Sequence, residues 1–410
     1  MLIGAGRNLF RMPAPAPTQA PPVSFDNTQI AFAAKSDAQL RKTYGLFAAM
    51  NNSGLVKTGS SLMQAALKWH LPGTKYLIKH SIFEQFCGGE TIAECRPVVA
   101  ALGRYGIGTI LDYSVEGEGN DASYDRTRDE LLATIDEAHR SAHIPFSVFK
   151  VTGVASAAVL EKIQAGQALT ATEQAAHARA VARVEALCAR AHQYGVRLFV
   201  DAEESWFQQT IDALVDEMMA KYNREQAIVW NTYQLYRHDR LEALQGAHNA
   251  AAQAGYHLGA KLVRGAYMEK EARAARQHGY PTPINPSKQV TDDLYDEALR
   301  YCMRHVARVS FCAGTHNEAS SLLLTQLMQE TGLVPGDERI WFAQLYGMSD
   351  NLSYNLAHAG YNVAKYLPYG PVEAVMPYLL RRANENTAIA GQSSREFLLV
   401  RRELNRRRAH

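Results

Sequence analysis

The chain has 410 residues, of which 47% are hydrophobic and 20% are charged, and its formal net charge is +2. This composition is ordinary for a globular enzyme and allows a large core. A net charge this close to zero creates no field that would recruit nucleic acid, and no run of 18 apolar residues is present. We therefore expect no nucleic-acid partner and no membrane-spanning helix.

The cysteines point to a reducing compartment. They stand at positions 87, 95, 188, 302 and 312, and none forms a Cys-x-x-Cys pair. An odd number at these spacings predicts buried thiols, with neither a disulfide framework nor a zinc site.

The first 104 residues carry no pattern typical of strands. Residues 1–26 hold five prolines, and the only charges before Asp26 are Arg7 and Arg11, so we expect disorder there. A weak mitochondrial presequence is the alternative, although the segment has poor amphipathicity. From 27 to 104 the apolar period is helical, with breaks at 51–54, 72–73 and 88–89, which predicts a helical arm or cap.

From residue 105 onward, short apolar runs typical of strands alternate with long helical stretches. The runs occur at 106–114, 146–152, 196–204, 227–234, 259–267, 310–316, 340–347 and 361–369. The predicted helices between them span 125–142, 172–194, 209–222, 240–254, 291–306, 319–331 and 350–359. Eight alternating units predict an α/β fold, a (β/α)8 barrel over 105–395, and an open doubly wound sheet is the alternative.

Polar side chains fall late in these runs, where a barrel has its catalytic face. They are Lys150, Thr152, Asp201, Glu203, Asn231, Gln234, Arg264, Tyr267, Thr315 and His316. Lys150 stands in an apolar strand and needs a partner if it is buried, or else it snorkels to solvent. Asp201 either orients a cation or caps the following helix. Gly265 lets the backbone approach a flat ligand beside Lys261 and Arg264.

A further helix is expected to begin near Val372, after the breakers Pro368, Gly370 and Pro371. Its polar residues Tyr378, Arg381, Arg382 and Glu385 follow the spacing i, i+3, i+4 and i+7, so they share one face. Paired guanidiniums beside a phenol suit a small carboxylate. A solvated, salt-bridged helix face is the alternative reading.

Several catalytic devices are missing from the sequence. His316 has no second histidine at ligand spacing, and no Rossmann glycine motif, P-loop or Gly-x-Ser-x-Gly elbow is complete. What remains is a set of cations, tyrosines and amides at a barrel mouth. Such a set suits catalysis by a bound organic cofactor.

The segments YLPYGPVEAVMPYLLRRANEN, KLVRGAY, FKVTG, FVDAEES, THNE and QLYGMSD together resemble the FAD-dependent proline dehydrogenase (proline oxidase) family, from about Lys57 to Arg395. The KLVRGAY and NTYQLY forms are similar to the monofunctional enzymes. The resemblance implies a distorted (β/α)8 TIM barrel with the last helix over its mouth.

The resemblance also implies substrate-binding roles. Lys150, Arg381 and Arg382 would bind the proline carboxylate, while Tyr366, Tyr378 and Leu345 would surround the ring. Asp201 would orient the cations, and Glu385 would hold Arg382 or Tyr366. As in the family, Tyr366 favours proline over 4-hydroxyproline, and a hydroxyproline dehydrogenase is the alternative.

The implied cofactor is FAD, with Lys261 near flavin N5 and the C4 carbonyl. Many family members carry arginine at that position, which leaves open how Lys261 and Arg264 divide their roles. The other positions that match cofactor contacts are Val200, Asn231, Gln234, Arg264, Gly265, Ala266, Tyr267, Thr315, His316 and Asn317, and, more weakly, Lys288.

The implied reaction is hydride transfer from proline C5 to flavin N5, which gives Δ1-pyrroline-5-carboxylate, with a quinone reoxidising the flavin. The rivals are a metal-dependent barrel lyase or hydrolase and a non-catalytic proline sensor. The implied location is the cytoplasm or the periphery of the inner membrane in a bacterium, and the mitochondrial matrix side in a eukaryote. The basic tail 396–410 is expected to be solvated or to touch anionic lipid.

Overall fold

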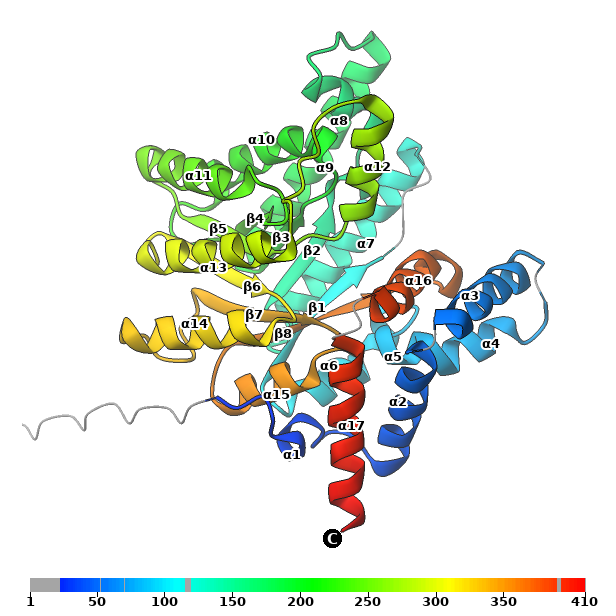
Figure 1. The fold of residues 1–410 in the computed structure, drawn as a ribbon. Helices are drawn as coiled ribbons and strands as arrows, with labels where there is room; N and C mark the ends of the chain where they lie inside the picture. Colours follow the sequence, from blue (N-terminus) through cyan, green and yellow to red (C-terminus); the bar gives the residue numbers. More distant parts are fainter. Residues whose placement is uncertain (1–22, 52, 70, 115–118, 389–391, 410) are drawn as a thin grey trace, which may run out of the picture.

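The computed structural model describes residues 23–409 except 52, 70, 115–118 and 389–391. Eight parallel strands close into a barrel in chain order, with β8 paired to β1 (Figure 1). They are β1 (Ile107–Tyr113), β2 (Phe146–Lys150), β3 (Arg197–Asp201), β4 (Val229–Gln234), β5 (Leu258–Val263), β6 (Val309–Gly314), β7 (Ile340–Leu345) and β8 (Val363–Tyr369). All overlap the predicted runs, so the barrel is confirmed and the open sheet is wrong.

The helices that follow the first seven strands surround the barrel. They are α7 (Asp121–Arg140), α8 (Ala157–Gln164), α9 (Ala171–Tyr194), α10 (Ser205–Tyr222), α11 (Arg240–Ala254), α12 (Met268–His278), α13 (Lys288–Arg304), α14 (Glu318–Glu330) and α15 (Asp350–His358), with a 3-10 turn at Val151–Gly153. Helices α8 and α12 are additions that the sequence pattern did not predict. Helix α9 begins with a capping box, in which Thr170 and Glu173 satisfy each other's backbone N–H groups.

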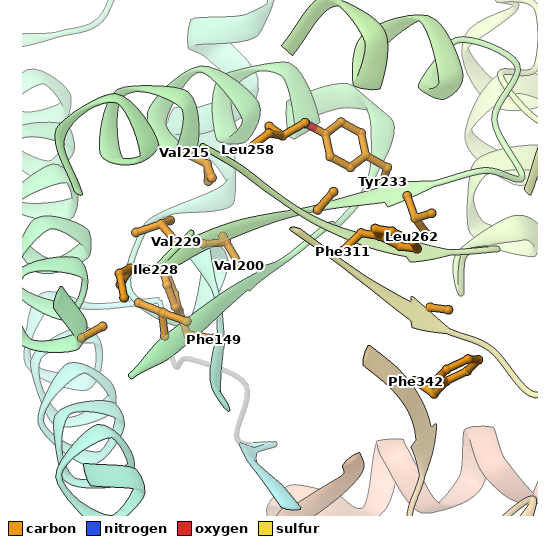
Figure 2. Close-up of a cluster of buried hydrophobic side chains, with 14 of the residues drawn as sticks. Phe149, Val200, Val215, Ile228, Val229, Tyr233, Leu258, Leu262, Phe311 and Phe342 are labelled. Carbon is orange, nitrogen blue, oxygen red and sulfur yellow. The ribbon is translucent and has the colours of Figure 1, made fainter. Parts of the chain in front are cut away.

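Two apolar layers form the core of the barrel. Inside it, Phe146 stacks on Phe199 with their centroids 4.2 Å apart, and Trp230 meets Phe146 edge-on at 5.2 Å. Outside it, Val200, Val229, Leu262 and other aliphatic side chains fill the space between the strands and the helices (Figure 2). Because these aromatic rings fill the interior, polar side chains are left to the C-terminal ends of the strands.

The residues before β1 form the helical arm, which consists of α1 (Thr28–Ala31), α2 (Asp37–Met50), α3 (Ser53–Lys68), α4 (Thr74–Ile78), a π-helical turn η1 (Lys79–Phe83), α5 (Glu84–Phe86) and α6 (Ile92–Gly103). The arm docks closely on the loop after β7. Gln85 Nε2 donates to the carbonyl oxygen of Gly347 at 2.8 Å. Gly347 has φ +78°, and a Cβ there would lie 2.0 Å from the carbonyl oxygen of Gln85, so the contact requires glycine.

Helix α16 (Val372–Ala388) follows β8 but does not pack beside the barrel. It packs on α2, α3 and η1 of the arm, whereas α15 and α6 cover the outer sides of β8 and β1 (Figure 1). Leu345 at the end of β7 packs both against the cluster of the barrel interior that contains Tyr366 and against the cluster that contains Tyr378 of α16. Helix α16 therefore lies over the barrel mouth, as expected.

The C-terminal segment forms helix α17 (Gln392–Arg408), where the sequence suggested a basic tail. Leu399, Val400 and Leu404 bury themselves against the arm, on Leu40 of α2. Arg406 and Arg407 both donate to the buried carboxylate of Glu403, so part of the tail's positive charge is neutralised internally. In the described part of the chain, no helix has both the length and the apolar character needed to cross a bilayer.

Candidate active site

Two lysines and one aspartate meet at the C-terminal ends of β2, β3 and β5. Lys150 and Asp201 are register partners on β2 and β3, and Lys150 Nζ lies 3.3 Å from Asp201 Oδ2. The other carboxylate oxygen, Oδ1, accepts a hydrogen bond from Lys261 Nζ. Asp112, at the end of β1, lies 3.9 Å from Lys150 and adds a second carboxylate. The cluster thus holds two ammonium groups between two carboxylates.

Burial and charge act in opposite directions on this cluster. Burial by itself would lower the pKa of Lys150, but the carboxylates of Asp112 and Asp201 raise that pKa above its ordinary value. Burial would likewise raise the pKa of Asp201, yet Lys261 and Lys150 hold it below its usual range. Lys150 and Asp201 are therefore both charged at neutral pH. Asp201 does not cap a helix, since Glu204 holds the cap position of α10.

Lys261 is 4% exposed and lies under Tyr366 of β8. Its ammonium group donates to the phenol oxygen of Tyr366 at 2.6 Å. Its Nζ also lies 5.2 Å from the centroid of the Phe199 ring, so one face of the cation is apolar. The pKa of the Tyr366 phenol is raised well above its usual value, chiefly by burial and then by Asp201, so the phenol stays protonated.

Helix α16 brings its arginines to this mouth. Arg382 is 7% exposed, and its guanidinium lies 5.3 Å from the centroid of the Tyr378 ring. Arg382 is one of the charges that lower the pKa of His316, and Arg381 is one of those that act on Tyr267, so the helix faces the ends of β5 and β6. The alternative of a solvated helix face is therefore wrong for Arg382. The side chain of Glu385 lies outside the described residues.

Arg264 forms a second cationic centre at the rim. Its Nη1 donates to Thr315 Oγ1 at 2.8 Å, its Nε to Asp292 Oδ1 at 2.7 Å, and its Nη2 to Ser320 Oγ at 3.0 Å. The guanidinium also lies 4.3 Å from the centroid of the Tyr295 ring. Lys288 pairs with the other oxygen of Asp292 at 2.5 Å and is mostly exposed. These contacts fix the guanidinium in one orientation.

The backbone after Arg264 is exposed and depends on glycine. Gly265 has φ +126°, and a Cβ there would lie 2.1 Å from the ring of Tyr236. Ala266 is also exposed, while Tyr267 is half-buried. Burial raises the pKa of Tyr267 above its ordinary value. This segment offers an exposed stretch of main chain beside the two cationic centres.

His316 and Asn317 have mainly structural partners. The backbone N–H of Leu345 donates to His316 Nε2 at 3.4 Å, so Nδ1 carries the proton and donates to Ser349 Oγ at 2.8 Å. Burial, assisted by the charges of Lys365 and Arg382, lowers the pKa of His316 to about 3, so the ring is neutral. Asn317 is the N-cap of α14. Within the residues that the structure describes, no group of three or more His, Cys, Asp or Glu side chains could hold a metal ion.

Two of the predicted cofactor residues point away from the barrel interior. Val200 belongs to the apolar layer between the strands and the helices (Figure 2). Asn231 donates from Nδ2 to Asp212 of α10 at 2.9 Å. Gln234 is buried, and its Nε2 donates to the carbonyl oxygen of Glu203 at 2.6 Å. A role of Val200 or Asn231 at the mouth is thus restricted to main-chain atoms.

Sequence reasoning missed two acidic residues of the mouth. Asp112 was not named, although it ends β1 as the other polar residues end their strands. Glu203 was noted only as a strand-end residue, yet it accepts hydrogen bonds from the backbone N–H of Thr152 at 3.0 Å and from the Thr152 hydroxyl. Its burial raises its pKa to about 7.

Fold and site together define a parallel-barrel enzyme whose mouth is built for a small anion. Residues 95–395 match the family model for proline dehydrogenase. The chain belongs to the proline dehydrogenase family.

Relatives that are named for different activities agree with this membership. The chain is 36% identical over 322 residues to the carbapenem antibiotics biosynthesis protein CarD of Pectobacterium carotovorum subsp. carotovorum, covering 78% of this chain and 83% of that protein. It is 32% identical over 376 residues to the mitochondrial proline dehydrogenase 1 of Dictyostelium discoideum, covering 81% of this chain and 66% of that protein. It is 30% identical over 414 residues to the hydroxyproline dehydrogenase of Xenopus laevis, covering 92% of this chain and 88% of that protein.

The chain spans 40% of the length of the human mitochondrial proline dehydrogenase 1, to which it is 41% identical over 241 residues. Among solved structures it is similar to proline utilization A of Bdellovibrio bacteriovorus, with a TM-score of 0.70 at 18% identity, covering 87% of this chain and 38% of that one. At this identity the likeness establishes the fold alone.

Proposed function

We propose that this protein oxidises L-proline to Δ1-pyrroline-5-carboxylate with FAD as its cofactor and a quinone as the electron acceptor. The observation that carries this proposal is the buried ammonium group of Lys261, held between Asp201 and Tyr366 at the barrel mouth. A fixed positive charge in a water-poor site stabilises negative charge that develops there. Family membership supports the same reaction.

The residues at the ends of β5 and β6 fit FAD. The exposed backbone of Gly265 and Ala266 gives a flat group close access, and Arg264 is fixed by Thr315 and Asp292 beside it. We assign Arg264 to the pyrophosphate, with Lys288 as the outer contact. The remaining cofactor residues in this assignment are Gln234, Tyr267, Thr315, His316 and Asn317, with the main chain of Val200 and Asn231. When bound, FAD supplies an electron sink that accepts a hydride.

The proline carboxylate is assigned to Lys150, Arg381 and Arg382. Lys150 is the most accessible cation of the inner cluster, with 38% of its side chain exposed, and Arg382 comes from above on α16. Charge-assisted hydrogen bonds from guanidinium to carboxylate give both affinity and orientation. Leu345 packs against both the cluster that contains Tyr366 and the cluster that contains Tyr378, and we assign these three side chains to the apolar walls around the pyrrolidine ring. Glu385 is assigned to hold Arg382 or Tyr366.

In this proposal the protein also orients the substrate and surrounds it with fixed charges. Proline must bind with a neutral ring nitrogen, because the nitrogen lone pair forms the C5=N bond as the hydride leaves C5. Asp201 holds Lys150 and Lys261 in place, and its charge helps to keep Lys150 protonated. Lys261 thereby offers its charge where electron density accumulates, while the substrate carboxylate remains on Lys150 and the arginines.

A hydroxyproline dehydrogenase is the second candidate, since the Xenopus laevis enzyme of that name is 30% identical over most of both chains. Tyr366 argues for proline. Its phenol oxygen already accepts from Lys261 at 2.6 Å, and in this proposal its ring forms the wall beside the carbon that would carry the added hydroxyl.

We propose that the enzyme works in the cytoplasm or at the periphery of the inner membrane if its source is bacterial, and on the matrix side if it is mitochondrial. A quinone acceptor dissolves in lipid, so contact with an anionic membrane is part of this proposal.

The test is an absorption spectrum of the purified protein before and after proline is added without oxygen or acceptor. Bleaching of a flavin band is expected. A coloured protein that proline leaves unchanged would refute the proposed reaction, and a colourless protein with stoichiometric metal would favour a metal-dependent barrel enzyme. A protein that binds proline without flavin absorbance would favour the sensor.

A further inference from the structure

One segment of the helical arm carries several exposed apolar side chains. Five of the ten large hydrophobic side chains exposed in the described part of the chain fall between residues 62 and 77. They are Leu62, Trp69, Leu71, Tyr76 and Leu77, each at least half exposed, and we call them the hairpin surface because they lie on α3, α4 and the turn between them. A cluster of this kind marks an interaction site.

The hairpin surface is not a missing piece of the core, because α3 already has a buried face. Met63 and Leu67 of α3 pack against the cluster that contains Val375 and Leu379 of α16. Leu62 of α3 and Trp69, which follows the helix directly, are instead exposed to solvent. Next to them, at the Pro72–Gly73 turn, a hollow of about 230 Å³ is lined by Leu67, Leu71 and Pro72.

The charge around the hairpin surface selects an anionic occupant. From Ala38 to Phe83 the sequence has six Lys or Arg residues, two His residues and no Asp or Glu, although the whole chain holds 43 basic and 41 acidic residues. Lys68 is exposed at the end of α3, and the side chain of Lys75 is 66% exposed while it pairs with Glu373. Two other lysines pair with glutamates that lie outside this stretch: Lys42 pairs with Glu84, and Lys79 pairs with Glu90 and Glu94.

A second copy of the chain fits this surface poorly, because two such faces would bring their lysines together. A lipid surface fits both features. Trp and Tyr rings with lysines beside them lie at the boundary between headgroups and acyl chains, and anionic lipids attract the basic side chains.

We infer that the hairpin surface inserts into the headgroup layer of an anionic membrane. This inference rests on the proposed function, which gives the enzyme a reason to bind lipid. Helix α3 packs directly on α16, and Lys75 pairs with Glu373 of that helix (Figure 1). Docking through α3 and α4 places the helix over the barrel mouth next to the bilayer, where a lipid-soluble electron acceptor resides. The arm, rather than the helix that replaces the basic tail, is then the membrane contact.

The test is flotation of the purified holoenzyme with phosphatidylcholine vesicles that contain phosphatidylglycerol, and with vesicles of phosphatidylcholine alone. The wild-type protein is expected to float with the anionic vesicles and to be released by high salt. The variant Trp69→Ser/Leu71→Ser/Tyr76→Ser/Leu77→Ser should partition at least about tenfold more weakly, because it removes the inserted apolar area. The variant Lys68→Gln/Lys75→Gln should lose the preference for anionic vesicles.

The matched control is Val334→Ser/Leu398→Ser, which removes two exposed apolar side chains elsewhere and should float like the wild type. Wild-type protein that stays off anionic vesicles at low salt would overturn the inference. Equal flotation of the four-serine variant and the wild type would also overturn it. Light scattering that shows a dimer of the wild type, absent from the four-serine variant, would do the same. Anaerobic reduction by proline is measured on every sample. Loss of that reduction with normal flotation would count against the proposed reaction alone, and normal reduction without flotation against the membrane surface alone.

Discussion

Lys261 and Tyr366 make a hydrogen bond across the inside of the barrel, with 2.6 Å between the ammonium nitrogen and the phenol oxygen. The two residues come from β5 and β8, which are not neighbours in the barrel. The same ammonium group also binds Asp201 of β3. One buried cation thus connects three strands and fixes the side chains that surround the proposed proline ring.

The first prediction concerns the charge of Lys261. Lys261→Met keeps most of the side-chain volume but removes the cation, so the rate of flavin reduction by proline should fall at least about tenfold. Stopped-flow absorbance without oxygen measures that rate. Lys221→Met is the control, because the side chain of Lys221 is 54% exposed and pairs with Glu185 on the outer helices, away from the mouth. Equal rates in the Lys261 variant and the wild type would remove Lys261 from the catalytic role.

The two arginines of α16 provide the second prediction. A charge-assisted hydrogen bond to a carboxylate is worth about 1.5–3 kcal/mol, so Arg381→Met and Arg382→Met should each raise the proline KM at least about tenfold. Steady-state kinetics with a soluble dye acceptor measures the change. Arg402→Met on α17 is the control, since its side chain is 63% exposed. An unchanged KM in either variant would exclude that arginine from substrate binding.

Tyr366 is expected to decide between proline and 4-hydroxyproline. Tyr366→Ser opens space beside Leu345 and should raise the ratio of kcat/KM for hydroxyproline over proline about tenfold, which corresponds to about 1.4 kcal/mol. Tyr366→Phe retains the ring, so this control should keep the wild-type ratio even though it loses the bond to Lys261. If both variants gave the wild-type ratio, selectivity would have to arise elsewhere.

Gly265 permits a prediction with a matched glycine. Both Gly265 and Gly279 have positive φ, at +126° and +70°, so alanine is strained at either position, and more so at Gly265 because +126° lies outside the left-handed helical region. A Cβ at Gly265 also collides with the ring of Tyr236, whereas a Cβ at Gly279 meets no atom within 4 Å. Gly265→Ala should therefore lose FAD on purification and Gly279→Ala should retain it, as the ratio of flavin to protein absorbance will report. Full FAD content in both variants would show that Gly265 does not contribute to cofactor binding.

Glu203 should make stability fall as pH rises. Its burial raises its pKa from 4.5 to about 7, so between these values the folded protein holds a proton that the unfolded chain has released. The unfolding free energy therefore decreases with pH across that window. Asp216 and Glu396, whose pKa values burial also raises to about 7, act in the same direction.

Glu203→Gln should weaken this decrease, measured as the difference between urea midpoints at pH 5 and pH 8. Glu338→Gln is the control, because its side chain is 83% exposed. A decrease of wild-type size in the Glu203 variant would show that this carboxyl does not titrate in that range.

Much of the fold could be predicted because the barrel repeats a local pattern. Each apolar run and its helix form one unit, so the strands and α11 at Arg240–Ala254 follow from hydrophobic period alone. Helices α8 and α12 were missed because they are short insertions within single units, where no second strand marks their ends.

The site was harder to predict, for a physical reason. Strands of a parallel barrel are buried on both sides, so their sequences lack the alternation that tells the inner side from the outer side. Asn231 therefore looked equivalent to Gln234 in the sequence, yet it turns outward to Asp212.

The sequence by itself determined the order of strands, the polar character of their C-terminal ends and the shared helix face of Tyr378, Arg381 and Arg382, because each depends on local spacing. Only the tertiary structure decided that Lys261 of β5 lies against Tyr366 of β8, that Asp112 joins the lysine cluster and that α16 covers the mouth. Those relations arise when the sheet closes on itself and the arm occupies the outside of α16, and no local pattern encodes either event.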